Sequence, residues 1–269
     1  MIILIMAVLT GVGTGLGLGL TETAGCGWSI FFGLLAFGVV QGVGGYLVQR
    51  KVKAAMASVQ AILVAGQKRL QAKVARWQMR PPGSLQAAQA EMERDQKVFV
   101  KEALAATEKL HRFDHWVPFM RRQIATAQFQ LHWMVRDFRA VDALMPRAMF
   151  LDPTMNAMKM ARLQMQDAPI EAISKVYDKA VRRLRYNQNV LLAATYSWIL
   201  LRRGDADAAF KALTRALDKS DNAVLKANRD QLANNRLAHF SNAGLGEQWY
   251  ALQLEQPRYS QPRQHMPRR

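Results

Sequence analysis

Residues 1–48 read MIILIMAVLTGVGTGLGLGLTETAGCGWSIFFGLLAFGVVQGVGGYLV, and this stretch decides the fold. Its two apolar runs, Met1–Leu20 and Trp28–Val48, contain no Lys, Arg, Asp or His, and the single acid, Glu22, lies between them. A helix of about 20 apolar residues is long enough to cross the roughly 30 Å hydrocarbon core of a bilayer. We therefore predict a transmembrane helical hairpin over residues 1–48.

A cleaved signal peptide is the alternative interpretation of the start. It requires a basic n-region, which residues 1–6 lack, and it does not require a second apolar run. Residues 23–26 weakly resemble a lipoprotein cleavage box, but Glu22 would interrupt the apolar approach to it. Cys26 is the only cysteine, which excludes a disulfide within the chain and a cysteine-rich metal site.

Glycine is concentrated in the apolar runs, since twelve of the 17 glycines precede residue 49. Lipid supplies no hydrophobic force between helices, so close approach at small residues is a main source of their association. We predict that the two spans pack through glycines spaced four apart, namely Gly11, Gly15 and Gly19 in the first span and Gly38 and Gly42 in the second. Packing within the hairpin is favoured because the connection is short, while a dimer or a larger membrane complex stays open.

The formal net charge of +17 is unevenly distributed. Residues 49–80 carry eight basic side chains and no acid, and residues 257–269 carry four arginines and no acid. Arg50, Lys51 and Lys53 directly follow the second span, as the positive-inside rule expects of a cytoplasmic flank, and they would attract anionic lipid headgroups. We predict an inner (cytoplasmic) membrane protein of a bacterium, with both termini and the body in the cytoplasm.

Residues 49–117 have the pattern of a basic antiparallel helical hairpin, or stalk. Apolar residues recur every three or four positions from Val52 to Trp77, and the sequence RPPGS at residues 80–84 then breaks the helix, with Ser84 placed to cap the next one. A second run to Val117 has a period near 3.5. Each arm would reach roughly 45–50 Å at 1.5 Å per residue. A coiled coil with another chain is the alternative.

Residues 118–240 contain two stretches with a common pattern of small and large residues. Asn189–Asn222 reads NVLLAATYSWILLRRGDADAAFKALTRALDKSDN, with a Gly-Asp turn between two helices, and Arg122–Met155 carries the same packing pattern. Both resemble the tetratricopeptide repeat, which has a 34-residue period. The resemblance implies an α-solenoid whose packing positions are Ala148, Ala180, Gly204 and Ala216, so the whole chain is predicted to be all-α.

The resemblance departs from the family at one position of the first helix in each repeat. Phe129 and Ser197 stand where the family has a small residue, which puts the concave groove in doubt, and an irregular helical bundle is the alternative. The family implies binding of a protein partner, and such arrays rarely catalyse a reaction. Residues 241–256 are predicted to cap the open end of the repeats, and Trp249 and Tyr250 in this segment could instead contact a partner. Residues 257–269 are predicted to be a disordered basic tail.

Candidate chemistry is sparse. His111 and His115 lie one helical turn apart and could chelate zinc, but no glutamate lies between them and Phe113 indicates a packing helix. We expect no metal, no cofactor and no catalytic residue. Arg182, Arg183 and Arg185 end a helix, where cations favour the dipole, and they could also contact phosphates of RNA.

The sequence therefore predicts a membrane-anchored scaffold or adaptor that organises a protein complex at the cytoplasmic face of the membrane. A membrane tether for an anionic particle such as a ribosome, and a structural subunit of a larger membrane complex, are the alternatives. Neither the partner nor the oligomeric state follows from the sequence.

Overall fold

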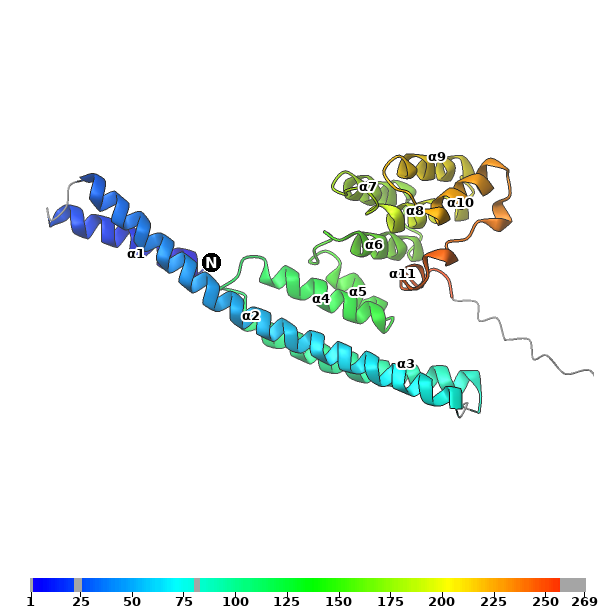
Figure 1. Ribbon diagram of the computed structural model, residues 1–269, viewed down its shortest axis with the longest axis horizontal. Helices are drawn as coiled ribbons and strands as arrows, with labels where there is room; N and C mark the ends of the chain where they lie inside the picture. Colours follow the sequence, from blue (N-terminus) through cyan, green and yellow to red (C-terminus); the bar gives the residue numbers. More distant parts are fainter. Residues whose placement is uncertain (1, 22–25, 80–82, 257–269) are drawn as a thin grey trace, which may run out of the picture. The chain divides into compact units, whose positions relative to one another are not determined.

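The computed structural model describes residues 2–21, 26–79 and 83–256, which are helical with turns and no strand. It divides into two compact units, Met1–Met149 and Phe150–Arg269, and each is described by itself. Figure 1 shows the helices in chain order. Three predicted segments lie wholly or partly outside the described residues. They are the predicted disordered tail 257–269, residues 80–82 of the predicted turn 80–84, and residues 22–25 of the predicted loop.

The first unit is built on one long helix. α1 spans Ile2–Leu20, and α2 runs without interruption over Cys26–Met79, across the predicted boundary between span and stalk at residue 48. Its 54 residues reach roughly 80 Å at 1.5 Å per residue. Both helices contain stretches long and apolar enough to cross a membrane, and the most apolar windows are only 11% and 6% buried. A core helix of a water-soluble protein would hide such side chains.

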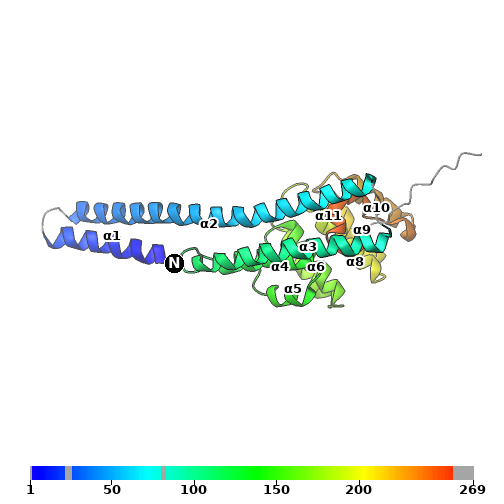
Figure 2. The same cartoon turned by 90° about the horizontal axis from the view of Figure 1, so that it is seen from below.

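α3 (Leu85–Glu108) runs antiparallel to the second half of α2, and the 3₁₀ helix η1 (Lys109–Phe113) follows it. The Oγ of Ser84 accepts a hydrogen bond from the Ala87 amide at 3.1 Å, which confirms the predicted cap. Figure 2 shows α1 and α3 following one another along α2. The hairpin buries apolar residues from both arms and from the next helix, namely Val59, Phe99, Val100, Ala103 and Leu131.

α4 (Met120–Met134) and α5 (Phe138–Leu144) belong to this first unit. α4 packs on α3 and η1, because the apolar face of α4 that carries Met120 and Ile124 completes the core formed by Leu110 and Phe113. The division between the two compact units falls after Met149. It lies within the stretch Arg122–Met155 that resembles a repeat, and α4 of that stretch packs on α3 and η1.

The second unit contains successive helix pairs, α6 (Pro153–Met165) with α7 (Ile170–Val181) and α8 (Val190–Arg202) with α9 (Ala206–Leu217), followed by α10 (Ala223–Ala233). α6 contacts α8, and α10 packs on α9. Side-chain caps begin several of these helices; the Oδ1 of Asp205, for example, accepts a hydrogen bond from the Ala208 amide at 2.8 Å.

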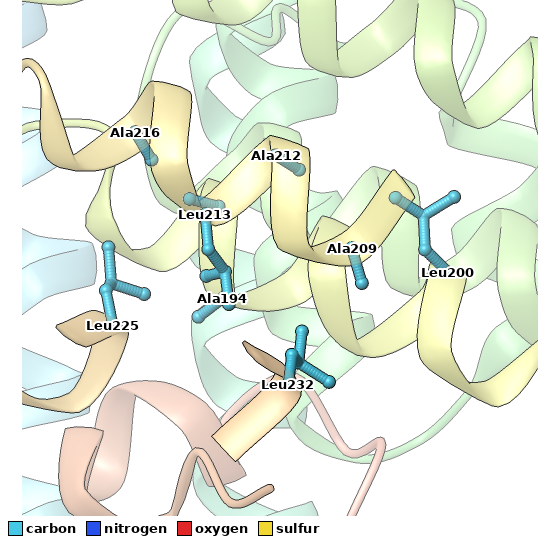
Figure 3. Close-up of a cluster of buried hydrophobic side chains, with 9 residues drawn as sticks. Ala194, Leu200, Ala209, Ala212, Leu213, Ala216, Leu225 and Leu232 are labelled. Carbon is cyan, nitrogen blue, oxygen red and sulfur yellow. The ribbon is translucent and has the colours of Figure 1, made fainter. Parts of the chain in front are cut away.

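Small residues allow α8 and α9 to approach closely. The core of the second unit contains alanines and leucines from α8, α9 and α10, with α9 crossing above α8 and Leu225 and Leu232 closing the cluster from α10 (Figure 3). Its buried residues are Ala193, Ala194, Leu200, Ala209, Ala212, Leu213, Ala216, Leu225 and Leu232. An alanine at a helix crossing leaves room for the neighbouring backbone, so the leucines fill the remaining volume.

The segment after α10 folds back over α8 and α10. It contains η2 (Leu237–His239), η3 (Ala243–Leu245) and α11 (Glu247–Tyr250). Buried amides hold it: Asn228 Nδ2 donates to Asn242 Oδ1 at 2.8 Å, and Asn242 Nδ2 donates to the Ala194 carbonyl at 3.0 Å. Trp249 of α11 is fully buried.

Candidate functional site

The two apolar helices touch backbone to backbone at glycine. A Cβ added to Gly11 would lie 2.8 Å from the Gly33 carbonyl oxygen, and one added to Gly33 would lie 2.7 Å from that of Gly11. A Cβ on Gly15 would lie 3.4 Å from the Ser29 carbonyl oxygen. These distances leave no room for a side chain at Gly11 or Gly33, so the contact depends on glycine at both.

Three of the five predicted packing glycines lie away from this contact. A Cβ on Gly19, Gly38 or Gly42 meets no atom within 4 Å. The face of α2 that meets α1 carries Ser29 and Gly33 instead, so Gly38 and Gly42 point elsewhere. The spacing Ser29-x-x-x-Gly33 is itself a pair of small residues on one helical face, and it is the signal in the sequence that indicates the observed contact.

The predicted membrane-surface residues Arg50, Lys51 and Lys53 are exposed at the end of the apolar part of α2. The opposite face of the same helix packs Val48 and Val52 against the core of η1 and α4. These three cations are therefore held on a rigid helix and directed away from the protein core. They lie where the apolar stretch of α2 changes to a basic one.

Further along α2, positive charge is paired within the stalk. Lys73 lies 2.7 Å from a carboxylate oxygen of Glu91 and also forms an ion pair with Asp95 on α3. Hydrogen bonds from the ammonium group to Asp95 and Glu91 raise the pKa of Lys73. Less positive charge is therefore available to an external partner in this part of the stalk than the number of basic residues indicates.

The predicted repeat-packing residues are divided between the two units. Ala180 and Ala216 are buried in the second unit, and Gly204 ends α8 with a φ of +85°, a conformation that favours glycine. Ala148 lies in the first unit after α5. Ser197, which departs from the family pattern, is fully buried and donates its hydroxyl proton to the Ala193 carbonyl at 2.7 Å. Its hydroxyl is satisfied within α8, so it packs as a small residue.

The predicted contact residues Arg182, Arg183 and Arg185 are exposed beyond the end of α7. Arg182 is the C-cap residue of α7 and has a right-handed helical conformation. The amides of Arg183 and Leu184 then donate hydrogen bonds to the carbonyls of Ala180 and Val181. The cations lie near the last carbonyls of α7, where they favour the helix dipole. The same exposed groups remain open to an anionic partner.

A carboxylate that binds two tryptophans organises the end of α8. One oxygen of Glu255 accepts from Trp198 Nε1 at 2.7 Å, and the other accepts from Trp249 Nε1 at 2.8 Å. The two indole rings meet edge to face at 5.9 Å. The Arg202 guanidinium lies 5.0 Å from the Trp198 ring centre and 3.7 Å from Glu255. The sequence pattern indicates Trp249 but not Trp198, Arg202 or Glu255, because Glu255 lies 57 residues from Trp198 in the chain.

This arrangement forms one wall of a hollow of about 850 Å³ in the second unit. Its lining comes from the end of α8, the segment after α10 and α11, and includes Trp198, Leu201, Arg202, Leu237, Phe240 and Tyr250. Tyr250, one of the predicted contact residues, therefore faces the hollow, while Trp249 supports it from within the core. The lining combines these aromatic and aliphatic side chains with polar ones, Ser241, Glu255 and Gln256, so it can hold an apolar side chain together with polar groups of a peptide.

The histidine motif is part of a hydrogen-bond network. His111 Nδ1 lies 3.0 Å from Asp114 Oδ2, and Arg121 Nε donates to the same oxygen at 2.9 Å. Burial alone raises the pKa of the Asp114 carboxyl, but the hydrogen bonds from His111 and Arg121 outweigh it and lower that pKa. Among the described residues no three His, Cys, Asp or Glu side chains are grouped to hold a metal ion.

Comparisons of the chain with models of protein families, with curated proteins and with solved structures find no match.

Proposed function

We propose that this protein is a membrane-anchored helical scaffold that holds a protein partner at the cytoplasmic face of a bacterial inner membrane. The observation that carries the proposal is the continuity of α2, which joins the apolar stretch to the stalk as a single helix. The stalk of the first unit is thus attached to the apolar stretch without a flexible linker between them.

The exposure of the apolar side chains supports insertion in lipid. Leu9, Leu16 and Leu34 are 67%, 59% and 66% exposed, although they lie in long apolar helices. Transfer of such area out of water is worth about 25 cal/mol per Å². Close packing of α1 on α2 at Gly11 and Gly33 supports a preformed hairpin of two spans.

The successive helix pairs of the second unit support a solenoid similar to the tetratricopeptide repeat. α6 packs on α7 and α8, and α9 packs on α8 and α10, which is the neighbour-to-neighbour order of stacked repeats. The hollow beside Trp198 then lies at the end of the array, and we propose it as the partner site. Its size and aromatic lining suit a few side chains of a peptide or helix.

Two experiments test these parts separately. Alkaline carbonate extraction should leave the full chain in the membrane pellet, and release to the supernatant would contradict anchoring. A photo-crosslinking amino acid at Leu237 or Tyr250 should form a discrete protein adduct in native membranes. The matched control is exposed Lys211 on α9, and adducts of equal yield there would contradict a specific site.

A tether for an anionic particle is the second candidate, because Arg50, Lys51, Arg182 and Arg183 are exposed. Binding through phosphate contacts falls steeply with salt, whereas a partner held through the aromatic side chains of the hollow depends less on salt. Recovery of adducts at low and moderate ionic strength therefore separates the two functions. Loss of the adduct at moderate salt would favour the charged tether.

A further inference from the structure

The loop between η1 and α4 lies beside the ends of both apolar helices. The Ile2 amide donates to the His115 carbonyl at 3.0 Å, and a Cβ on Gly44 would lie 3.1 Å from the Ile3 side chain. Figure 2 shows the start of α1 beside the end of α3. Val48 packs on the core of η1 and α4. The loop is thus at the level where the apolar part of α2 changes to its basic part.

This loop exposes two aromatic side chains. Phe119 is 68% exposed and Trp116 is 38% exposed, while their neighbours Phe113 and Met120 are 7% and 1% exposed. Phe119 has a φ of 61°, a left-handed conformation that is an outlier for a bulky residue. The adjacent buried residues hold it there. Phe119 is the N-cap residue of α4, and its large apolar ring is left exposed there, where it can contact something outside the chain.

The charges around these rings are basic. Arg112 and Arg122 are exposed in the same stretch of chain. The only acid in the loop, Asp114, has a side chain that is 9% exposed and is paired with His111 and Arg121. Exposed cations therefore lie in the same stretch as the exposed rings, and the local acid is neutralised inside the protein.

We infer that residues 112–122 form an interfacial loop that inserts Phe119 and the edge of Trp116 into an anionic lipid surface at the stalk end of the hairpin. Amphipathic aromatic rings are enriched at the level of lipid headgroups, and nearby arginines bind the phosphates. The inference rests on the proposed anchoring of α1 and α2. The loop adds a third contact with the membrane and orients the stalk relative to it.

Spin-label accessibility in nanodiscs tests the inference with the full chain. In a Cys26→Ser background, single cysteines at Phe119, at Leu35 in the apolar part of α2 and at exposed Val98 in the middle of α3 are labelled. In discs of phosphatidylcholine and phosphatidylglycerol, the ratio of oxygen to nickel-chelate accessibility should be several-fold higher at 119 than at 98. A ratio at 119 equal to that at 98, with the label at 35 still protected, would overturn the loop insertion alone. Exposure of the label at 35 would instead overturn the anchoring.

A second measurement tests the phenylalanine ring and the charges. With the label at residue 116, Phe119→Asn should increase nickel-chelate access several-fold, because asparagine tolerates the left-handed backbone and lacks the ring. Unchanged access would contradict insertion of Phe119. Discs of phosphatidylcholine alone should protect the label at 119 less than anionic discs, and equal protection would overturn the role of the arginines.

Discussion

Replacement of Gly11 by leucine should separate α1 from α2, whereas the same replacement at Gly19 should not. A Cβ on Gly11 would lie 2.8 Å from the Gly33 oxygen and 2.9 Å from the Phe37 Cβ, and the residue contacts backbone that cannot rotate away. Favourable contacts lie near 3.5–4.0 Å, so the helices must move apart by roughly 0.6–1 Å for the Cβ alone. Gly19 faces open space and serves as the control.

The expected loss is about 1–3 kcal/mol, the usual cost of overpacking a close contact. Any gain in helix propensity, at most about 1 kcal/mol, is common to both variants and cancels in the comparison. The difference between Gly11→Leu and Gly19→Leu is therefore the cost of the lost contact between the two helices. At about 1.4 kcal/mol per tenfold, it corresponds to roughly a 5- to 150-fold change in the packing equilibrium.

A disulfide reports the packing in the full chain. Ile3 and Gly44 are adjacent across the two helices, so Ile3→Cys and Gly44→Cys in a Cys26→Ser background should cross-link during a short oxidant pulse. The yield at increasing SDS fraction gives a midpoint for separation. The midpoint should fall for Gly11→Leu and stay unchanged for Gly19→Leu. Equal midpoints, or a larger fall for Gly19→Leu, would refute the contact described here.

Three further predictions concern the parts outside the apolar hairpin. Gly66→Ala should destabilise the stalk by about 1–2 kcal/mol in thermal unfolding. The new Cβ would lie 2.4 Å from Cγ of the buried Phe99 ring, and the cost of this overpacking exceeds the gain in helix propensity. A rise in melting temperature would contradict this. Glu255→Gln leaves one indole without a carboxylate acceptor. Because the Glu255 side chain is 31% exposed, we expect the free energy of unfolding to fall by about 1 kcal/mol, and tryptophan fluorescence to shift to the red. An unchanged emission maximum would argue against the shared carboxylate. The pKa of Asp114 is lowered from its ordinary value of 3.8, so its contribution to stability is present above that pH and is lost as the pH falls through the folded-state pKa. Unfolding of Asp114→Asn beside the unaltered chain should therefore show a stability difference near neutral pH that disappears in acid, and a constant difference would contradict the network.

Periodicity and composition were sufficient for the helical parts of the first unit. The apolar runs, the break near residues 80–84 and the Ser84 cap are local features, and the structure has helices that end and begin there. The turn at Gly204 is also local, because a single backbone conformation requires glycine. These features depend on neighbours in the chain, so the order of residues alone specifies them.

Only the tertiary structure decided which faces meet. The rotation of α1 and α2 selects Gly33 over Gly38, because either face of a glycine-rich helix satisfies the same spacing rule. α4 packs on the stalk because its apolar face, which carries Met120 and Ile124, joins the cluster that contains Leu110 and Phe113. The repeat pattern in the sequence does not indicate this contact. Trp198 and Glu255 are 57 residues apart, so no local pattern joins them. Sequence determines helices and their apolar stripes, whereas complementary shape and long-range hydrogen bonds choose the partner of each stripe.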